Sequence, residues 1–161
     1  MVGKAEKRLD TSIAQSALEK IRSLGQNSTA LLTVQETRDP TLVRNSGEDA
    51  LARFAATLQT LNTQGGGRSI FAGMPPDSPA VADVETIMAA LEAEISLAGA
   101  DTAETVAAVV DSWFDAGGGY DTVGYLGDVA SAFGTKLSAT ETAPDQITAQ
   151  DPGIRSFLSE L

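Results

Sequence analysis

The sequence predicts a mainly α-helical protein with a smaller α+β part. Apolar residues recur at helical spacing in four stretches, and segments rich in glycine or proline separate them. Of the 161 residues, 42% are apolar but only 5% are aromatic, which favours helices packed through small side chains. We therefore expect an antiparallel helical rod segment, followed by an outer domain of two helices and short strands.

Two helices are expected in the rod segment, residues 1–64. The first should end at Pro40, because the residue before a proline is pushed out of helical geometry, and Gly25 weakens its middle. A polar loop with Asn45, Ser46 and Gly47 should lead into the second helix. The two should form an antiparallel hairpin whose narrow seam stays partly exposed. The stripe of the first helix is Leu9, Ile13, Ala17, Ile21, Leu24, Ser28, Leu31 and Gln35, and that of the second is Leu51, Phe54, Leu58 and Leu61.

A hinge is expected after the rod. The turn Gln64-Gly65-Gly66-Gly67 should stop the second helix, and a short extended segment follows it. Pro75 and Pro76 then force a rigid change of direction. The expected division is a rod at 1–64, a hinge at 65–79, an outer α+β domain at 80–150, and a return into a rod helix at 151–161.

The outer domain should contain a third helix over roughly 80–98 and a fourth that starts near Asp101 or Thr102. Asp101 and Glu104 have the spacing of a capping box, and Gly117-Gly118-Gly119 should end the fourth helix. The inward residues are expected to be Val84, Met88, Leu91 and Ile95, supported by Val81 and Ile87, and then Val106, Val109, Val110, Trp113 and Phe114. Short strands and turns are expected over 120–150, around Tyr120, Val123, Tyr125, Lys136, Leu137, Thr140 and Ile147.

The charge is strongly acidic and uneven. Residues 1–44 carry seven Lys or Arg against five Asp or Glu, a net of +2, whereas residues 45–161 carry four against seventeen, a net of −13. The acidic region repels a phosphate backbone and an anionic membrane surface, so neither nucleic acid nor membrane is an expected partner. No apolar run approaches the roughly 20 residues that span a bilayer.

Motifs for catalysis and cofactor binding are incomplete. Around Gly65–Gly67, Arg68 and Asn62 stand where a phosphate-binding loop needs Lys and Gly, and Thr122 replaces the last glycine of a dinucleotide fingerprint. The chain has no His and no Cys. A carboxylate pair such as Asp83 and Glu85 is ordinary on an exposed helix. We expect no enzyme, no cofactor and no metal.

Four acidic residues surround the second glycine run and raise a calcium hypothesis. Asp111, Asp115, Asp121 and Asp128 are spaced four, six and seven residues apart, unlike the alternating ligands of a calcium loop. Solvated acids near helix ends are therefore the expected reading of all four. Trp113 and Phe114 lie at helical spacing beside Val109 and Val110, so we expect core packing in preference to a ligand cage.

Three motifs follow one another along the chain. In stretch 61–73 a helix ends in Leu-Asn and leads through Gly-Arg to an aromatic turn that closes on Gly. Stretch 113–128 runs from Trp-Phe-Asp through the glycine run to Gly-Tyr-Leu-Gly-Asp, and stretch 151–158 opens a helix with Asp-Pro and has Ile154 where an aromatic is commoner. The residues that carry these motifs are Asn62, Gly67, Arg68, Phe71, Gly73, Trp113, Phe114, Tyr125, Gly127, Asp128, Asp151 and Pro152.

In this order the motifs resemble the hook–filament junction proteins of bacterial flagella, the FlgL family of hook-associated proteins in the flagellin superfamily. The resemblance implies a structural adaptor that joins the flagellar hook to the flagellin filament. It also implies export by the flagellar type III apparatus, an extracellular location, and flagellin, hook-associated proteins of the hook tip and an export chaperone as partners. The family's long terminal helices have no counterpart, so we expect a core fragment that is monomeric, whereas the full-length protein would form a ring or helical assembly.

Two alternative hypotheses remain. The first is a flagellin filament subunit, although the Asn/Arg-rich rod motif typical of flagellins is absent. The second belongs to a different class: a small acidic helical domain that binds a ligand or calcium through the aspartate-rich glycine loop.

Overall fold

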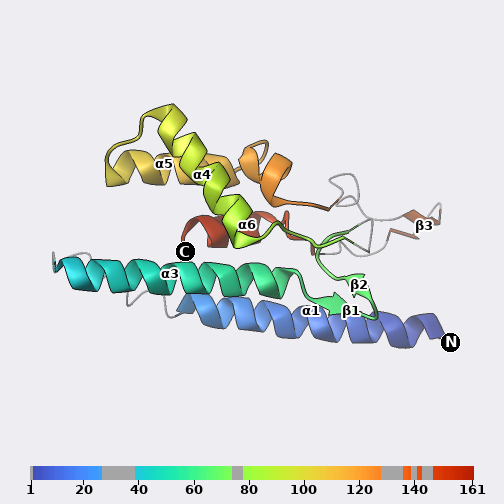
Figure 1. Ribbon diagram of the computed structural model, residues 1–161. Coiled ribbons are helices and arrows are strands. Elements are labelled where there is room, and N and C mark those ends of the chain that lie inside the picture. Colours follow the sequence, from blue (N-terminus) through green and yellow to red (C-terminus); the bar gives the residue numbers. More distant parts are fainter. Residues whose placement is uncertain (1, 27–38, 74–77, 128–135, 139–140, 143–146) are drawn as a thin grey trace.

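The computed structural model describes residues 2–26, 39–73, 78–127, 136–138, 141–142 and 147–161. The protein is mainly helical with small antiparallel sheets, which confirms the predicted fold class. Helices α1 (Val2–Gln26) and α3 (Pro40–Leu61) run antiparallel and form one layer, here called the helix pair. Helices α4 (Val84–Ala98) and α5 (Ala103–Phe114) form the outer pair, and α6 (Pro152–Ser159) lies between the two pairs (Figure 1).

The helix pair packs through part of the predicted stripes. Ala17 and Ile21 of α1 are buried, and so are Phe54, Leu58 and Leu61 of α3. By contrast, the Leu9 side chain is 58% exposed and that of Leu51 is 45% exposed. The expected partly exposed seam is therefore confirmed. Ser28, Leu31 and Gln35 lie outside the described residues.

Pro40 begins a helix, so the prediction that it ends one is wrong. Proline is well tolerated at the first helical position, where its missing N–H has no intrahelical partner to lose. Asp39 caps the same end, because its carboxylate accepts a hydrogen bond from the Thr41 N–H at 2.8 Å. The predicted loop at 45–47 is also wrong, since these residues continue α3 and Gly47 is accommodated on its exposed side.

A tight hairpin follows α3. Asn62 is the C-cap of the helix, and β1 (Gln64–Gly65) pairs antiparallel with β2 (Arg68–Ser69). Gly66 and Gly67 connect the strands with φ of 58° and 78°. Two consecutive positive φ angles suit the turn that matches strand twist, and glycine adopts them without steric cost.

The outer pair is capped at both N-termini. The Thr86 N–H donates to Asp83 at 2.7 Å at the start of α4. At the start of α5, Thr102 and Thr105 form the capping box, so the predicted pair Asp101 and Glu104 is wrong by one residue. The threonine hydroxyls satisfy the first free N–H groups of α5, and Glu104 in the first turn faces solvent.

The inward faces of the outer pair follow the prediction in part. Ile87, Leu91, Trp113 and Phe114 are buried, while Val81 is buried just before α4 begins. The remaining predicted positions are half-buried: Val84, Met88, Ile95, Val106, Val109 and Val110.

The surface charge of the outer pair is entirely acidic. The sequence contains no Lys or Arg between Arg68 and Lys136. Exposed carboxylates on α4 and α5 include Glu85, Glu92, Glu94, Glu104 and Asp111. Positive charge in the described structure is thus carried by other elements, chiefly α1.

The region 120–150 is only partly as expected. Tyr120–Gly124 forms a single turn of π-helix, η1, so a strand at Tyr120 and Val123 is wrong. Strands β3 (Lys136–Ser138) and β4 (Glu141–Thr142) pair antiparallel, which confirms strand structure at Lys136 and Leu137. Ile147 lies in no strand, and Thr140 is outside the described residues.

One core extends through both layers. It joins Leu58 and Leu61 of α3 to Ile87 of α4, and Phe71, from the predicted hinge, is completely buried in it. Pro75 and Pro76 lie outside the described residues, so the division at 65–79 stays a prediction. No described helix is both long and apolar enough to cross a membrane.

Candidate functional site

Five of the eleven motif residues that the structure describes lie where the helix pair joins the outer pair. Asn62, Phe71, Gly73, Tyr125 and Gly127 lie at this place, which we call the joint, and Trp113 and Phe114 lie in an aromatic cluster behind it. Gly67 and Arg68 are exposed in the hairpin, and Asp151 and Pro152 start α6. Asp128 lies outside the described residues.

Asn62 makes the first connection of the joint. Its side-chain amide donates to the Val81 carbonyl at 2.9 Å and its amide oxygen accepts from the Val81 N–H at 2.9 Å. Both backbone groups of Val81 are thereby satisfied by the side chain of Asn62, while the Asn62 backbone N–H caps the end of α3. The end of α3 is consequently fixed to the segment that leads into α4.

Backbone pairing makes the second connection. Val81 and Tyr125 form an antiparallel bridge, flanked by hydrogen bonds from the Ala82 N–H to Gly124 O at 2.8 Å and from the Leu126 N–H to Ala80 O at 2.9 Å. The π-helical turn therefore ends directly on the segment before α4.

Residues 70–73 make the third connection. The Tyr125 hydroxyl donates to the Ala72 carbonyl at 2.8 Å, and the Ala149 N–H donates to Phe71 O at 3.0 Å. A side chain at Gly127 would overlap the Ala72 carbonyl, so the close approach at this point requires glycine. Hydrogen bonds within the joint thus connect five segments of the chain: Asn62, residues 71–72, residues 80–82, residues 124–126 and Ala149.

The aromatic cluster supports the joint from α5. The rings of Trp113 and Phe114 are 4.9 Å apart, and that of Tyr120 lies 5.3 Å from Phe114. Phe54 of α3 contacts Phe114 edge-on at 6.3 Å, which links the helix pair to the outer pair. The Trp113 indole lies so close to Gly119 that a side chain there would overlap it.

An ion pair that was not predicted from the sequence lies beside the aromatic cluster. Arg155 of α6 pairs with Asp121, and the Asp121 carboxylate also accepts from the Gly117 N–H at 2.6 Å and from the Gln150 amide at 3.1 Å. Asp121 is thus not the solvated acid expected from its spacing. The partners are 34 residues apart, and the only signal for Arg155 was its place in the Asp-Pro motif of α6.

Burial and hydrogen bonding shift the pKa values of Asp121 and Tyr120. Burial alone raises the pKa of Asp121, but hydrogen bonds from Arg155, Gly117 and Gln150 and the positive charge of Arg155 outweigh it, so the net pKa is lowered. Burial raises the pKa of Tyr120 well above its ordinary value. The Tyr120 hydroxyl is therefore a neutral donor, and it binds the Ala149 carbonyl at 2.9 Å.

The remaining acids near the glycine run point to solvent. Asp111 and Asp115 are exposed, and Asp83, also exposed, caps α4. Within the ranges that the structure describes, no three acidic side chains gather in a group that could hold a metal ion.

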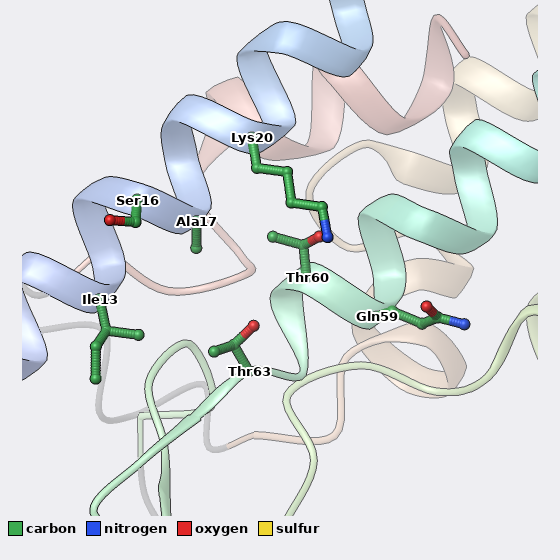
Figure 2. Close-up of a pocket in the computed structure, with 7 residues that line it drawn as sticks. All are labelled: Ile13, Ser16, Ala17, Lys20, Gln59, Thr60 and Thr63. Carbon is green, nitrogen blue, oxygen red and sulfur yellow. The ribbon is translucent and has the colours of Figure 1, made fainter.

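A groove of about 400 Å³ lies between α1 and α3 (Figure 2). Ile13 and Ala17 supply its apolar surface, and the Lys20 side chain extends along the wall toward Thr60. Its lining residues are Ile13, Ser16, Ala17, Lys20, Gln59, Thr60 and Thr63. An open groove along two antiparallel helices suits the side chains of a third helix.

Comparisons of the chain with protein-family models, curated protein sequences and solved structures found no match. The geometry itself supports two roles: the joint holds distant segments together, and the groove offers a packing surface along the helix pair.

Proposed function

We propose that the protein is a structural adaptor that joins the flagellar hook to the flagellin filament, as the resemblance to hook–filament junction proteins implies. The observation that carries the proposal is the convergence of the motif residues. Asn62, Phe71 and Tyr125 make hydrogen bonds within the joint, Gly127 lies against the Ala72 carbonyl, and Gly73 follows Ala72 in the chain. Motifs that share a structural role give the resemblance more weight than scattered identities.

The joint gives this adaptor a defined shape. An adaptor must present its surfaces to two partners at a fixed angle, and the joint holds the helix pair and the outer pair through Asn62, Tyr125 and the Phe54–Phe114 contact. The proposed mechanism is the burial of apolar surface between subunits, without covalent chemistry.

The helix pair is the proposed packing surface. Leu9 and Leu51 are exposed, and the groove lies between α1 and α3. Burying such apolar surface yields about 25 cal/mol per Å², so helices that cover it supply the energy of assembly. In this proposal, flagellin and hook-associated proteins of the hook tip are the partners, an export chaperone accompanies the unfolded chain, and the protein works outside the cell.

The test is binding to flagellin filaments and to hook components, measured by co-sedimentation. Light scattering of the chain alone at micromolar concentration should give a monomer, because the acidic surface opposes association between copies. Ser16→Trp should weaken the binding, because Ser16 lines the groove. Gln15→Trp is the matched control, since Gln15 is also exposed and polar on α1 but does not line the groove.

Three outcomes contradict the adaptor. The first is the absence of binding to either partner, and the second is filament formation by the chain alone, which favours a flagellin subunit. The third is thermal stabilisation by calcium, which favours the ligand-binding alternative, since a ligand at 100-fold its Kd stabilises by about 2.7 kcal/mol.

A further inference from the structure

The groove between α1 and α3 contains one charged side chain, that of Lys20. Its α1 side is a single helical face, because the lining residues from this helix recur every three or four positions: Ile13, Ser16, Ala17 and Lys20. This face extends over about two turns, or about 10 Å along the helix axis. The opposite side is the end of α3 and the residues after it, where the lining side chains are uncharged: Gln59, Thr60 and Thr63. The charge in the groove is therefore positive.

The Lys20 ammonium has no carboxylate partner in the part of the chain that the structure describes. The ion pairs recorded there belong to Arg53 and Arg155, and neither includes Lys20. Glu19, next to Lys20 in the sequence, is exposed but does not line the groove. The Lys20 side chain is exposed and extends along the groove wall toward Thr60 (Figure 2). An external carboxylate can therefore pair with this ammonium without displacing an internal one.

The net charge differs in sign between α1 and the outer pair. Helix α1 contains five Lys or Arg against three Asp or Glu, a net of +2. Helices α4 and α5 together contain five Asp or Glu and no Lys or Arg, a net of −5. An acidic partner is therefore repelled by the outer pair and attracted by α1. Electrostatic complementarity of this kind steers association and selects between partners.

The side chains that line the groove are mostly short. Ser16, Ala17, Thr60 and Thr63 let the backbone of an occupant approach closely, and Ile13 adds apolar surface at one end. A helix packs by placing its side-chain ridges into the grooves of the helices beside it. The groove is thus suited to a helix that carries apolar and small residues on its contact face.

We propose that the groove binds an acidic α-helix of another protein, which places an apolar side chain against Ile13 and a carboxylate beside Lys20. These two partner residues are about seven positions apart, because Ile13 and Lys20 are separated by about two helical turns. The inference rests on the proposed packing role of the helix pair and adds the chemistry of the helix that packs there. Charge also fixes where the partner docks, since the outer pair repels it.

Titration of the whole isotope-labelled chain with synthetic peptides, followed by nuclear magnetic resonance, tests this proposal. One alanine-rich helical peptide carries Leu and Glu about seven positions apart, and the other has Gln in place of that Glu. Both should shift the backbone amides of residues 13–20 and 59–63. The Glu peptide should bind more tightly by up to about fivefold, the range of an exposed ion pair.

Three variants assign that preference to the groove. Lys20→Gln should remove the difference in affinity between the two peptides. Arg22→Gln is the matched control and should keep the difference, because Arg22 is an exposed cation of α1 that does not line the groove. Ser16→Trp should weaken the binding of both peptides. The spectrum of each variant without peptide verifies that it is folded.

Equal affinity of the unsubstituted chain for the two peptides overturns the proposal, and so does the absence of binding by either. Shifts confined to α4 and α5 would overturn it as well. Groove amides that shift with protein concentration alone would make a second copy the occupant, which also contradicts it. The titration needs neither flagellin nor hook components. Selective peptide binding without co-sedimentation therefore contradicts the adaptor alone, whereas co-sedimentation with equal peptide affinities contradicts only the acidic partner helix.

Discussion

At the scale of single residues, Trp113 shows how a local pattern specifies burial. It follows Val106, Val109 and Val110 on one face of α5, and its side chain is only 5% exposed. Helical spacing was enough to predict this, because the residues that define the face are neighbours in sequence. The contact of its ring with Tyr120 was not predictable, since Tyr120 comes from another element.

Trp113→Ala should lower the free energy of unfolding by about 3–5 kcal/mol, the usual cost of a large-to-small change in a core. The cavity would face Phe114 and Tyr120, which would lose their edge contacts. Urea unfolding followed by far-UV circular dichroism measures the effect. Native emission at the wavelength of a water-exposed indole would contradict the burial of Trp113.

Asp121 should make stability depend on pH in the acid range. Its pKa is lowered in the folded state, so its ionised form stabilises the protein above the ordinary value near 3.9. This contribution is lost as the pH falls below about 4 and the carboxylate becomes protonated in the folded state. Asp121→Asn should therefore be less stable than the unsubstituted chain at pH 7, and the difference should shrink toward pH 3.

Urea unfolding at several pH values between 3 and 7 measures that difference. Asp111→Asn is the matched control, because it makes the same substitution at an exposed aspartate near the end of α5. A difference between Asp121→Asn and the unsubstituted chain that stays constant with pH would show that the ion pair does not form.

At the scale of helices and strands, the sequence predicted which elements exist better than where they begin. Pro40 was predicted to end a helix because the residue before a proline is pushed out of helical geometry, but proline is itself favoured in the first turn of a helix. The choice depended on Asp39, whose capping bond distinguishes a start from an end. At Thr102 the competing caps were one residue apart, and spacing alone could not separate them.

Two glycines in helices make a matched pair for testing the contact between α1 and α6. At Gly47 a side chain would meet nothing within 4 Å, whereas at Gly25 it would overlap the Phe157 ring. Gly47→Ala should raise the free energy of unfolding by about 0.5–1 kcal/mol, the gain in helix propensity. Gly25→Ala should lower it by about 1 kcal/mol, because the displaced ring costs more than the helix gains.

Urea unfolding of both variants measures this contrast. Equal stabilisation by the two substitutions would mean that Phe157 does not lie on Gly25. Helical spacing alone indicates only that Gly25 weakens its helix, because the ring that lies against it comes from a segment more than 130 residues away.

At the scale of the whole molecule, the fold class was predictable but the joint was not. Helical periodicity and the glycine runs are local properties, and they were sufficient for a mainly helical protein with short strands. The joint depends on pairs such as Asn62 with Val81 and Tyr125 with Ala72, which are 19 and 53 residues apart. Its residues could be named from the resemblance, but no spacing rule indicates that they meet.

The absence of Lys and Arg from the outer pair has a practical consequence for chemical labelling of the protein. Apart from the terminal amine, the amines of the chain are Lys4, Lys7, Lys20 and Lys136, which lie in α1 and β3. A gold or fluorescent label carried by an amine-reactive ester will therefore leave α4 and α5 unlabelled, whereas Lys20 on α1 is exposed to it. Trypsin, which cuts after Lys and Arg, will likewise release 69–136 as one uncut peptide. Carbodiimide coupling to carboxylates reaches α4 and α5, so the two chemistries together distinguish the outer pair from α1.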